Sequence, residues 1–364
     1  MTSRPRQIGL VIGQLGFGGA EGQLTELALG LSAAEDRPTV YCLSPIVEPF
    51  GRRLKAGGIT VRVIPRIGAF DLARAVRLAF AFRRDGIDAV QSYLIDSNPY
   101  ALLAARLAGI HPFVAANRNA YVARDGVRAA LDGIAFRRAS AVVVNAIAVR
   151  EFTARRFSVP LDRFRVIYNG VDLRRFRRAE RSGSTLRIGT AGSLTSKKNP
   201  QMFVEVATAL AQRFGHLECL HAGDGPLRTC LGSAVGEGAR ATVRFLGNVP
   251  EIGSFLQRLD VFLLTSDHEG CPNVLLEAMA CGVPVVTTDA GGAAEIVRDG
   301  LTGHVVPRRA AGEMVDRASE LLQDSHLREQ MGRAARADVE ERFPIERMIT
   351  ETREVLRAVA LERR

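Results

Sequence analysis

Short apolar runs alternate with longer helical patterns along the first half of the chain. The runs are rich in Val, Ile and Ala and are bounded by Gly, Pro or charged residues, as buried strands of a parallel sheet are. The predicted strands lie at residues 8–12, 39–43, 61–64, 89–91, 113–116, 141–144 and 166–168. Helical patterns are predicted at residues 21–32, 71–84, 99–108 and 124–138. This alternation predicts a doubly wound α/β domain.

The second half repeats the alternation after a charged, non-periodic stretch at residues 174–184, which is typical of a linker. One helix is well marked, because Asn199 can cap it and Pro200 suits its first turn. Its apolar positions, three and four residues apart, are Phe203, Val206, Ala207 and Leu210. Further strands are predicted at 186–190, 261–264 and 283–287, and helices near 310–323, 327–342 and 345–361.

These elements predict two α/β domains and a final helix. The first domain is expected at residues 1–173 and the second at 185–344, with the linker at 174–184 between them. The helix within residues 345–364 carries an apolar stripe that must pack on another element. The stripe consists of Ile345, Met348, Ile349, Leu356 and Val359.

Composition narrows the class of protein. The chain has 364 residues with 47% apolar content, which suits two domains of ordinary size. We find no apolar run near the ~18–20 residues that a membrane span needs, and residues 7–12 are typical of a first strand rather than a secretory core. The five cysteines are scattered without C-x-x-C spacing, which favours reduced thiols and a cytoplasmic location.

The net charge of +10 is unevenly distributed. Residues 1–180 hold 27 basic and 15 acidic side chains, whereas residues 181–364 hold 22 and 24. The first domain is therefore expected to meet an anionic partner, either a phospholipid surface or a diphosphate-bearing acceptor, unless its arginines are only a solvated surface. Nucleic acid is not expected, because no aromatic-rich stacking module accompanies the charge.

Lysine is rare in this chain. Only Lys55, Lys197 and Lys198 occur, and two of the three are adjacent in one loop. Since the chain otherwise places arginine at its basic positions, this pair indicates a local requirement for a compact ammonium, which acts on phosphate as a point charge.

The most informative segment runs from Asp260 to Val297. It predicts a buried strand, a loop that contains Glu269, a short helix that contains Glu277, a second strand and a Gly-Gly turn. Pro272 opens the helix and Gly282 closes it. The amide end of this helix would face the loop glutamate, so the segment predicts a pocket for a ligand with hydroxyls and phosphates.

Six stretches, in order along nearly the whole chain, resemble family 4 of the retaining, nucleotide-sugar-dependent glycosyltransferases, whose hallmark is two glutamates separated by seven residues. The resemblance implies the GT-B fold, in which two Rossmann-like domains face a cleft and the last helix crosses back to the first domain. Besides the segment with Glu269 and Glu277, the stretches are Gly18–Glu21, Val166–Asp172, Thr190–Pro200, His221–Leu227 and Phe245–Val249.

The resemblance assigns roles on the donor side. It places Lys198 on the diphosphate, Glu269 against the donor sugar hydroxyls and Glu277 on the ribose. It makes the loop with Gly18 and Gly19 phosphate-facing, where missing side chains allow close backbone approach. Glu295, after the Gly-Gly turn, completes the pocket or caps the following helix. The backbone of residues 270–274 is expected to help hold the sugar. These residues are Gly270, Cys271, Pro272, Asn273 and Val274, of which the proline has no N–H to donate.

The acceptor side departs from the family pattern. Many relatives carry a histidine near the reacting centre, and residues 91–98 of this chain contain none. Asp96 takes the most similar place and is expected either to orient or deprotonate the acceptor hydroxyl or to form an Asx turn. Asn117 and Arg118, at the end of the next strand, are further acceptor-side candidates. A second departure is Ser193, where the family often has an arginine.

Three other functions are less well supported by the sequence. A dinucleotide oxidoreductase is disfavoured, because Glu21 stands at the third fingerprint glycine and no acidic residue ends the strand at 39–43. A sugar-nucleotide epimerase of the same fold would turn over without an acceptor. A catalytically weak, nucleotide-sugar-binding subunit or regulator would bind donor without transferring it.

The sequence therefore predicts a retaining, metal-independent GT-B glycosyltransferase without a cofactor, since no Asp-x-Asp motif occurs. The expected donor is a UDP- or GDP-sugar. The expected acceptor is a surface polysaccharide or a polyprenyl-diphosphate-linked glycan. The expected location is the cytoplasm, peripheral to the inner face of the cell membrane.

Overall fold

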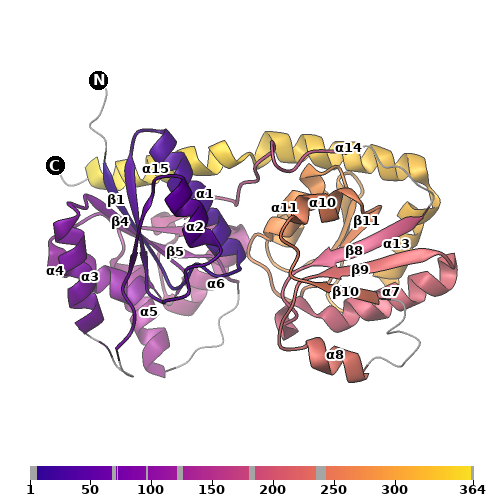
Figure 1. Ribbon diagram of the computed structural model, residues 1–364, viewed down its shortest axis with the longest axis horizontal. Coiled ribbons are helices and arrows are strands. Elements are labelled where there is room, and N and C mark those ends of the chain that lie inside the picture. The colour runs from indigo at the N-terminus through magenta and orange to yellow at the C-terminus, as the bar shows by residue number, and fades with distance from the viewer. Residues whose placement is uncertain are drawn as a thin grey trace. The chain divides into compact units, whose positions relative to one another are not determined.

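The computed structural model describes residues 6–67, 71, 73–95, 97–120, 126–179, 185–234 and 243–361. It divides into two compact units, each described by itself below (Figure 1). Unit 1 comprises residues 1–169 together with 345–364, and unit 2 comprises residues 170–344. The division after residue 344 falls where the final helix is expected to begin. The division after residue 169 precedes the expected end of the first domain at residue 173, and Val171 hydrogen-bonds through its backbone to Phe343 of unit 2.

Unit 1 is built on a seven-stranded parallel sheet in the order β3-β2-β1-β4-β5-β6-β7. The order reverses between β1 and β4, so loops at the carboxyl ends of these two strands diverge and leave room for a ligand. The strands are β1 (Gln7–Ile12), β2 (Arg37–Cys42), β3 (Thr60–Val63), β4 (Ala89–Tyr93), β5 (Phe113–Asn117), β6 (Ala141–Val144) and β7 (Phe164–Val166).

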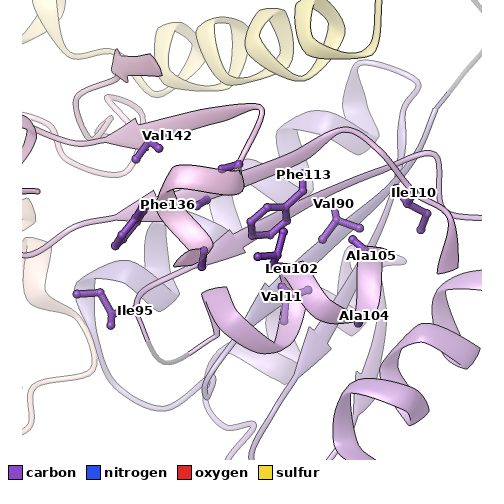
Figure 2. Packing of buried hydrophobic residues seen from close by; sticks show 14 of the residues in the cluster. Val11, Val90, Ile95, Leu102, Ala104, Ala105, Ile110, Phe113, Phe136 and Val142 are labelled. Carbon is purple, nitrogen blue, oxygen red and sulfur yellow. The ribbon is translucent and has the colours of Figure 1, made fainter. Parts of the chain in front are cut away.

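Two apolar cores cover the two faces of this sheet. One lies mainly beneath α3, α4 and α5, and Figure 2 shows Leu102, Phe113 and Phe136 packed in it. The other lies beneath α1 and α15. The helices are α1 (Gly19–Ala33), α2 (Phe50–Ala56), α3 (Ala73–Arg84), α4 (Asn98–Ala108), α5 (Gly126–Arg138), α6 (Ile147–Phe157) and α15 (Ile345–Leu361).

The last helix, α15, packs against α1 of unit 1. Met348 and Leu356 of its apolar stripe are buried in the core, and Gly30 of α1 makes room for Ile349, since a methyl group there would overlap that side chain. Arg353 Nε donates to Asp36 Oδ2 over 2.7 Å. The apolar stripe of the last helix thus packs on α1, within the unit that holds the first sheet.

Unit 2 contains a six-stranded parallel sheet in the order β10-β9-β8-β11-β12-β13. Its strands are β8 (Leu186–Ala191), β9 (Leu217–Ala222), β10 (Val243–Gly247), β11 (Val261–Leu264), β12 (Val285–Thr288) and β13 (Gly303–Val306). Its helices are α7 (Pro200–Phe214), α8 (Arg228–Ala234), α10 (Ile252–Gln257), α11 (Asn273–Ala280), α12 (Ala293–Ile296), α13 (Ala311–Gln323) and α14 (Ser325–Arg342). The predicted cap of α7 is present, because Asn199 Oδ1 accepts from Met202 N over 3.2 Å.

Several local predictions were wrong. Helices α2 and α6 were not predicted, because both are short and rich in charged or small residues. The strand expected at 283–287 begins only at Val285: the amide of Val283 still bonds to Ala278 at the end of α11, and Pro284 has no N–H to give to a ladder. Among the helices described, we find none long and apolar enough to span a membrane.

Candidate functional site

Three loops meet at the carboxyl edge of the sheet in unit 2. They follow β8, β11 and β12, and backbone and side-chain hydrogen bonds tie them together. Asp267 N donates to Lys197 O over 2.8 Å, and Thr288 Oγ1 donates to Ser266 O over 2.6 Å. Gly292 N reaches Glu269 O at 3.4 Å. One region is therefore formed by the loop after β8 with Lys197 and Lys198 (the lysine loop), the loop after β11 with Glu269 (the glutamate loop) and the Gly-Gly turn after β12.

An ion pair joins the first two loops. Lys198 Nζ lies 2.5 Å from Glu269 Oε1, and Ser266 Oγ donates to the same oxygen over 2.6 Å. The Glu269 side chain is 9% exposed and that of Lys198 is 21% exposed, so both charges are largely withdrawn from water. The side-chain hydrogen bonds seen in the described residues all go to Oε1. An ammonium has three donors, so two N–H groups of Lys198 and the oxygen Oε2 of Glu269 remain for a ligand.

Glycines allow the lysine loop to pack closely on the loop after β9. A methyl group on Gly223, where φ is +133°, would overlap the carbonyl oxygen of Gly192. One on Gly225 would come within 2.7 Å of the backbone of Leu194. Gly192 N bonds to Ala222 O, and Leu194 N bonds to Asp224 O. The glycines of the stretch His221–Leu227 therefore hold the lysine loop in place.

Helix α11 begins directly after the glutamate loop, with Pro272 at its N-cap position. Its buried side is formed by Leu275, Leu276, Ala278, Met279 and Ala280. Asn273, Val274 and Glu277 are half-buried, so the helix is not covered all round. Asn273 and Glu277 are four residues apart and share one face. The structure thus leaves Glu277 accessible on the partly open face of α11.

The other donor residues expected in the second domain lie in the same region of unit 2. Gly270, Cys271 and Pro272 are buried in the loop before α11. Glu295 is half-buried in the first turn of α12, and its carbonyl oxygen accepts from Arg342 Nη2 over 2.8 Å.

Some residues of this region were missed by the sequence analysis. Ser266 orients Glu269, and Asp267 is held by Arg309 at 3.1 Å and by Asn199 at 3.4 Å. Arg309 comes from the loop after β13 and has a positive φ of 66°. The signal that could have found Ser266 and Asp267 is their place directly after a buried strand, where ligand-facing loops begin.

His221 lies in the stretch at 221–227 but belongs to the core of unit 2. It is buried on β9 between the rings of Phe203 and Phe245, and its Nδ1 has no hydrogen-bond partner in the described part of the chain. Burial lowers the pKa of His221 to about 4. The imidazole is therefore neutral at physiological pH.

Gly18 and Gly19 lie in unit 1, where they are exposed at the start of α1. Gly18 is the N-cap residue, and a methyl group there would overlap the carboxylate of Glu21. The preceding loop is fixed by the hydrogen bond from Leu15 N to Ile46 O at 2.8 Å. The carboxylate of Glu21 thus folds back on the first turn of α1, as an acidic group at a helix N-terminus does.

Asn117 and Arg118 lie at the carboxyl edge of the unit 1 sheet and are buried. Asn117 donates to Thr153 Oγ1 over 2.8 Å and accepts from Asn119 N over 3.1 Å, so both ends of its amide are used within the protein. Asp96, the other acceptor-side candidate, lies outside the described residues.

Arg118 carries a buried charge with few partners. Its guanidinium lies 4.8 Å from the centre of the Tyr93 ring and donates to Asn169 Oδ1 over 2.5 Å. Its Nε is buried without a hydrogen-bond partner, and no carboxylate in the described ranges forms an ion pair with it. A buried cation of this kind favours a nearby anion.

Two doubly wound parallel-sheet units, with a phosphate-compatible cation at the carboxyl edge of the second, define the GT-B class of α/β fold. Solved structures share it: HepE of Anabaena in complex with UDP has a TM-score of 0.84 at 20% identity, covering 97% of this chain and 100% of that one. HepE in complex with UDP-glucose has a TM-score of 0.83 at 19% identity, covering 97% and 99%.

The family follows from the sequence comparisons. Residues 17–175 match the model described as Glycosyltransferase Family 4, and residues 185–324 match that described as Glycosyl transferases group 1. Together the two matches cover most of the chain, which belongs to the family 4, group 1 glycosyltransferases.

Curated relatives match over part of their length. The D-inositol 3-phosphate glycosyltransferase of Paenarthrobacter aurescens is 31% identical over 56% of this chain and 53% of its own. The Vi polysaccharide biosynthesis protein VipC/TviE of Salmonella typhi is 30% identical over 44% and 29%. The chain thus spans about half or less of these two relatives.

Proposed function

We propose that the chain is a retaining, metal-independent glycosyltransferase that moves a sugar from a nucleotide sugar to a glycan acceptor. The observation that carries the proposal is the Lys198–Glu269 ion pair, which presents an ammonium and a carboxylate oxygen side by side at the carboxyl edge of the unit 2 sheet. The first suits a diphosphate and the second suits sugar hydroxyls.

Transfer requires the bond between the anomeric carbon and the diphosphate to break while the acceptor oxygen bonds to that carbon on the same face. Lys198 neutralises the charge that develops on the leaving diphosphate, so no divalent metal is needed for that purpose. Glu269 holds the sugar by its hydroxyls, with Ser266 fixing the carboxylate. Glu277, on the partly open face of α11, accepts hydrogen bonds from the ribose. Asp96 takes up the proton of the acceptor hydroxyl, or orients that hydroxyl while the leaving diphosphate takes up the proton.

The donor is a UDP- or GDP-sugar. The HepE structures are complexes with UDP and with UDP-glucose, which makes a UDP-sugar the first donor to test. The acceptor is a surface polysaccharide or a polyprenyl-diphosphate-linked glycan, in line with the polysaccharide biosynthesis that the relative from Salmonella typhi is named for. The diphosphate of a polyprenyl-linked acceptor would suit the buried guanidinium of Arg118.

The proposed location is the cytoplasm, at the inner face of the membrane. None of the five cysteines, all in described residues, forms a disulfide. The basic character of residues 1–180 supports attraction to anionic lipid.

Thermal stabilisation by a panel of UDP-, GDP-, ADP- and dTDP-sugars tests the donor assignment. One nucleotide sugar is expected to raise the melting temperature by linkage, and Lys198→Ala and Glu277→Ala are each expected to abolish the rise. No rise with any nucleotide in the wild-type protein would overturn both assignments.

Transfer to a glycan acceptor, followed by anomeric analysis of the product and by addition of a chelator, tests the reaction. Retention of configuration and full activity with chelator are expected. A donor that stabilises the protein but is never transferred would instead indicate the catalytically weak, nucleotide-sugar-binding subunit.

A further inference from the structure

Three neighbouring helices of unit 1 expose apolar side chains on their outer side. Helices α3, α4 and α5 pack side by side over one face of the sheet (Figure 1), with α4 in contact with both of the others. Their inner residues, such as Leu78, Leu102 and Phe136, are buried in the core. Their outer apolar residues form what we term the outer helical face: Val76, Phe80, Leu103, Leu107, Val127, Leu131 and Ile134.

These side chains are open to solvent. Phe80 is 69% exposed and Val127 is 76% exposed. Within each helix the exposed residues are three or four positions apart, so they form stripes rather than isolated positions. In unit 2, by contrast, the only large apolar side chains exposed among the described residues are Leu246 and Leu301. An apolar surface of this extent in one unit indicates an interaction site.

The charge of the same helices specifies the partner. Together α3, α4 and α5 contain eight arginines and a single acidic residue, Asp132, which is buried. Arg106, Arg128 and Arg138 are exposed beside the outer helical face. Helices α13 and α14 of unit 2, which expose no large apolar side chain, hold five arginines and seven acidic residues. The basic charge therefore accompanies the apolar stripes.

We propose that the outer helical face is a docking surface for an anionic phospholipid bilayer. Exposed aliphatic side chains enter the boundary between headgroups and acyl chains, and the arginines beside them pair with lipid phosphates. A second copy of the chain is disfavoured as the occupant, since the same face on both copies would bring like charges together. Nucleic acid is disfavoured, because six of the seven apolar residues are aliphatic and cannot stack on bases.

A hollow beside α5 adds a place for a headgroup. It has a volume of about 320 Å³ and lies between α5 and α6, lined by Gly126, Gly133, Arg137, Arg156 and Ser158. Arg137 Nη1 donates to Phe157 O over 2.8 Å, which fixes one guanidinium at the rim. Two arginines around a small polar hollow suit a phosphate group.

The proposal rests on the proposed function for its purpose, because it would keep the enzyme beside a lipid-linked acceptor. Its test needs neither donor nor acceptor. The full-length protein is floated with vesicles of phosphatidylcholine alone or with roughly 30 mol % phosphatidylglycerol, in ~0.1 M salt. Retention by the anionic vesicles alone is expected. No retention by either would overturn the proposal and the membrane location, and would leave the proposed transfer reaction intact.

Matched variants locate the surface. Two double variants are expected to reduce binding to the anionic vesicles at least about tenfold each. One is Phe80→Ser/Leu131→Ser and the other is Arg128→Gln/Arg138→Gln. The controls are Leu246→Ser/Leu301→Ser and Arg244→Gln/Arg258→Gln, exposed positions of unit 2, which are expected to bind as the wild type does. Melting curves without vesicles check that every variant is folded.

Two further results would overturn the assignment of this face to lipid. Equal loss in the control and test variants would show that binding is general attraction to the chain. Concentration-dependent dimerisation in analytical ultracentrifugation, abolished by Phe80→Ser/Leu131→Ser without any vesicle binding by the wild type, would identify a second copy as the occupant.

Discussion

Lys198 and Glu269, 71 residues apart in the sequence, form an ion pair of 2.5 Å at the carboxyl edge of the unit 2 sheet. The two charges neutralise one another within the protein, and Ser266 supplies a further donor to the carboxylate. A phosphate that approaches Lys198 therefore meets an ammonium that is already oriented, and the ordering of its long side chain has been completed on folding.

Removal of one partner of this pair should cost more than removal of both charges. Lys198→Met leaves the Glu269 carboxylate buried beside Ser266 alone, and we expect a loss of about 1–3 kcal/mol in the free energy of unfolding. Adding Glu269→Gln should recover part of it, because a neutral amide needs no counter-charge. A double-mutant cycle by urea denaturation measures the coupling, and strictly additive effects would contradict a functional ion pair.

Glu277 is predicted to recognise the ribose. Glu277→Gln should weaken binding of the ribonucleoside diphosphate about tenfold or more, because a charged acceptor of hydroxyl protons is replaced by a neutral one. Binding of the 2′,3′-dideoxy analogue should hardly change. Titration calorimetry compares the two ligands, with Glu205→Gln, an exposed position of α7, as the control. An equal loss for both analogues would place Glu277 away from the ribose.

Arg118 is predicted to bind an anionic group of the acceptor. Arg118→Gln keeps a donor for Asn169 but removes the charge, so the KM for a phosphate-bearing acceptor should rise about tenfold or more, whereas the Kd for the donor should stay constant. Steady-state kinetics with phosphorylated and neutral acceptors separates the two effects. A rise of KM that is the same for both acceptors would argue for a purely structural role.

Gly223 is predicted to be intolerant of any side chain. Gly223→Ala places a methyl group against the carbonyl oxygen of Gly192 at a φ of +133°, and should cost at least about 2 kcal/mol and weaken donor binding through the displaced lysine loop. Gly312→Ala is the control, since it lies in α13 with open space around its Cα and should stabilise by up to about 1 kcal/mol. Thermal melts that move equally in both variants would refute the loop contact.

His221 is predicted to make unit 2 sensitive to acid. Its pKa in the folded protein is about 4, below the ordinary value of 6.5, so the unfolded state binds more protons between these values. The resulting contribution of His221 to the free energy of unfolding amounts to up to about 3 kcal/mol. It is present in full above about pH 6.5 and is lost as the pH falls towards 4. Burial lowers the pKa of His304 as well, with the same sign.

Urea denaturation of wild type and His221→Leu at a series of pH values isolates this contribution. The difference in unfolding free energy between the two proteins should shift by about 2–3 kcal/mol between pH 7 and pH 4, in favour of the variant at low pH. A difference that is constant with pH would show that His221 is not the residue responsible.

Much of the fold could be predicted, because strands and helices follow from local periodicity and end signals. Asn199 and Pro200 mark the start of α7, and Phe113 to Ala116 already form most of β5. Elements without such a pattern were missed: α6 carries charged residues on several sides, and only three of its eleven residues are buried. Where the apolar positions show so little periodicity, a single sequence gives no sign that a helix is present.

The candidate site was predicted in its residue types and only partly in its arrangement. Spacing placed Glu269 in a loop and Glu277 in a helix, and the structure agrees with both. It did not show that Lys198 pairs with Glu269, or that Ser266 orients the carboxylate. The first contact joins the loops after β8 and β11, which are neighbours only because of the strand order of the sheet, and the second depends on how the loop after β11 folds back on itself.

The sequence by itself determined the alternation of strands and helices, the family, and the chemistry available at Lys198 and Glu269, since each depends on residue type and short-range spacing. The tertiary structure decided which distant positions meet and which apolar positions stay uncovered. It placed α15 on α1, buried Arg118 without a counter-charge among the residues that the structure describes, and left Phe80 and Leu131 open to solvent. An apolar stripe looks the same in the sequence whether or not another element covers it, because burial depends on packing between segments far apart in the chain.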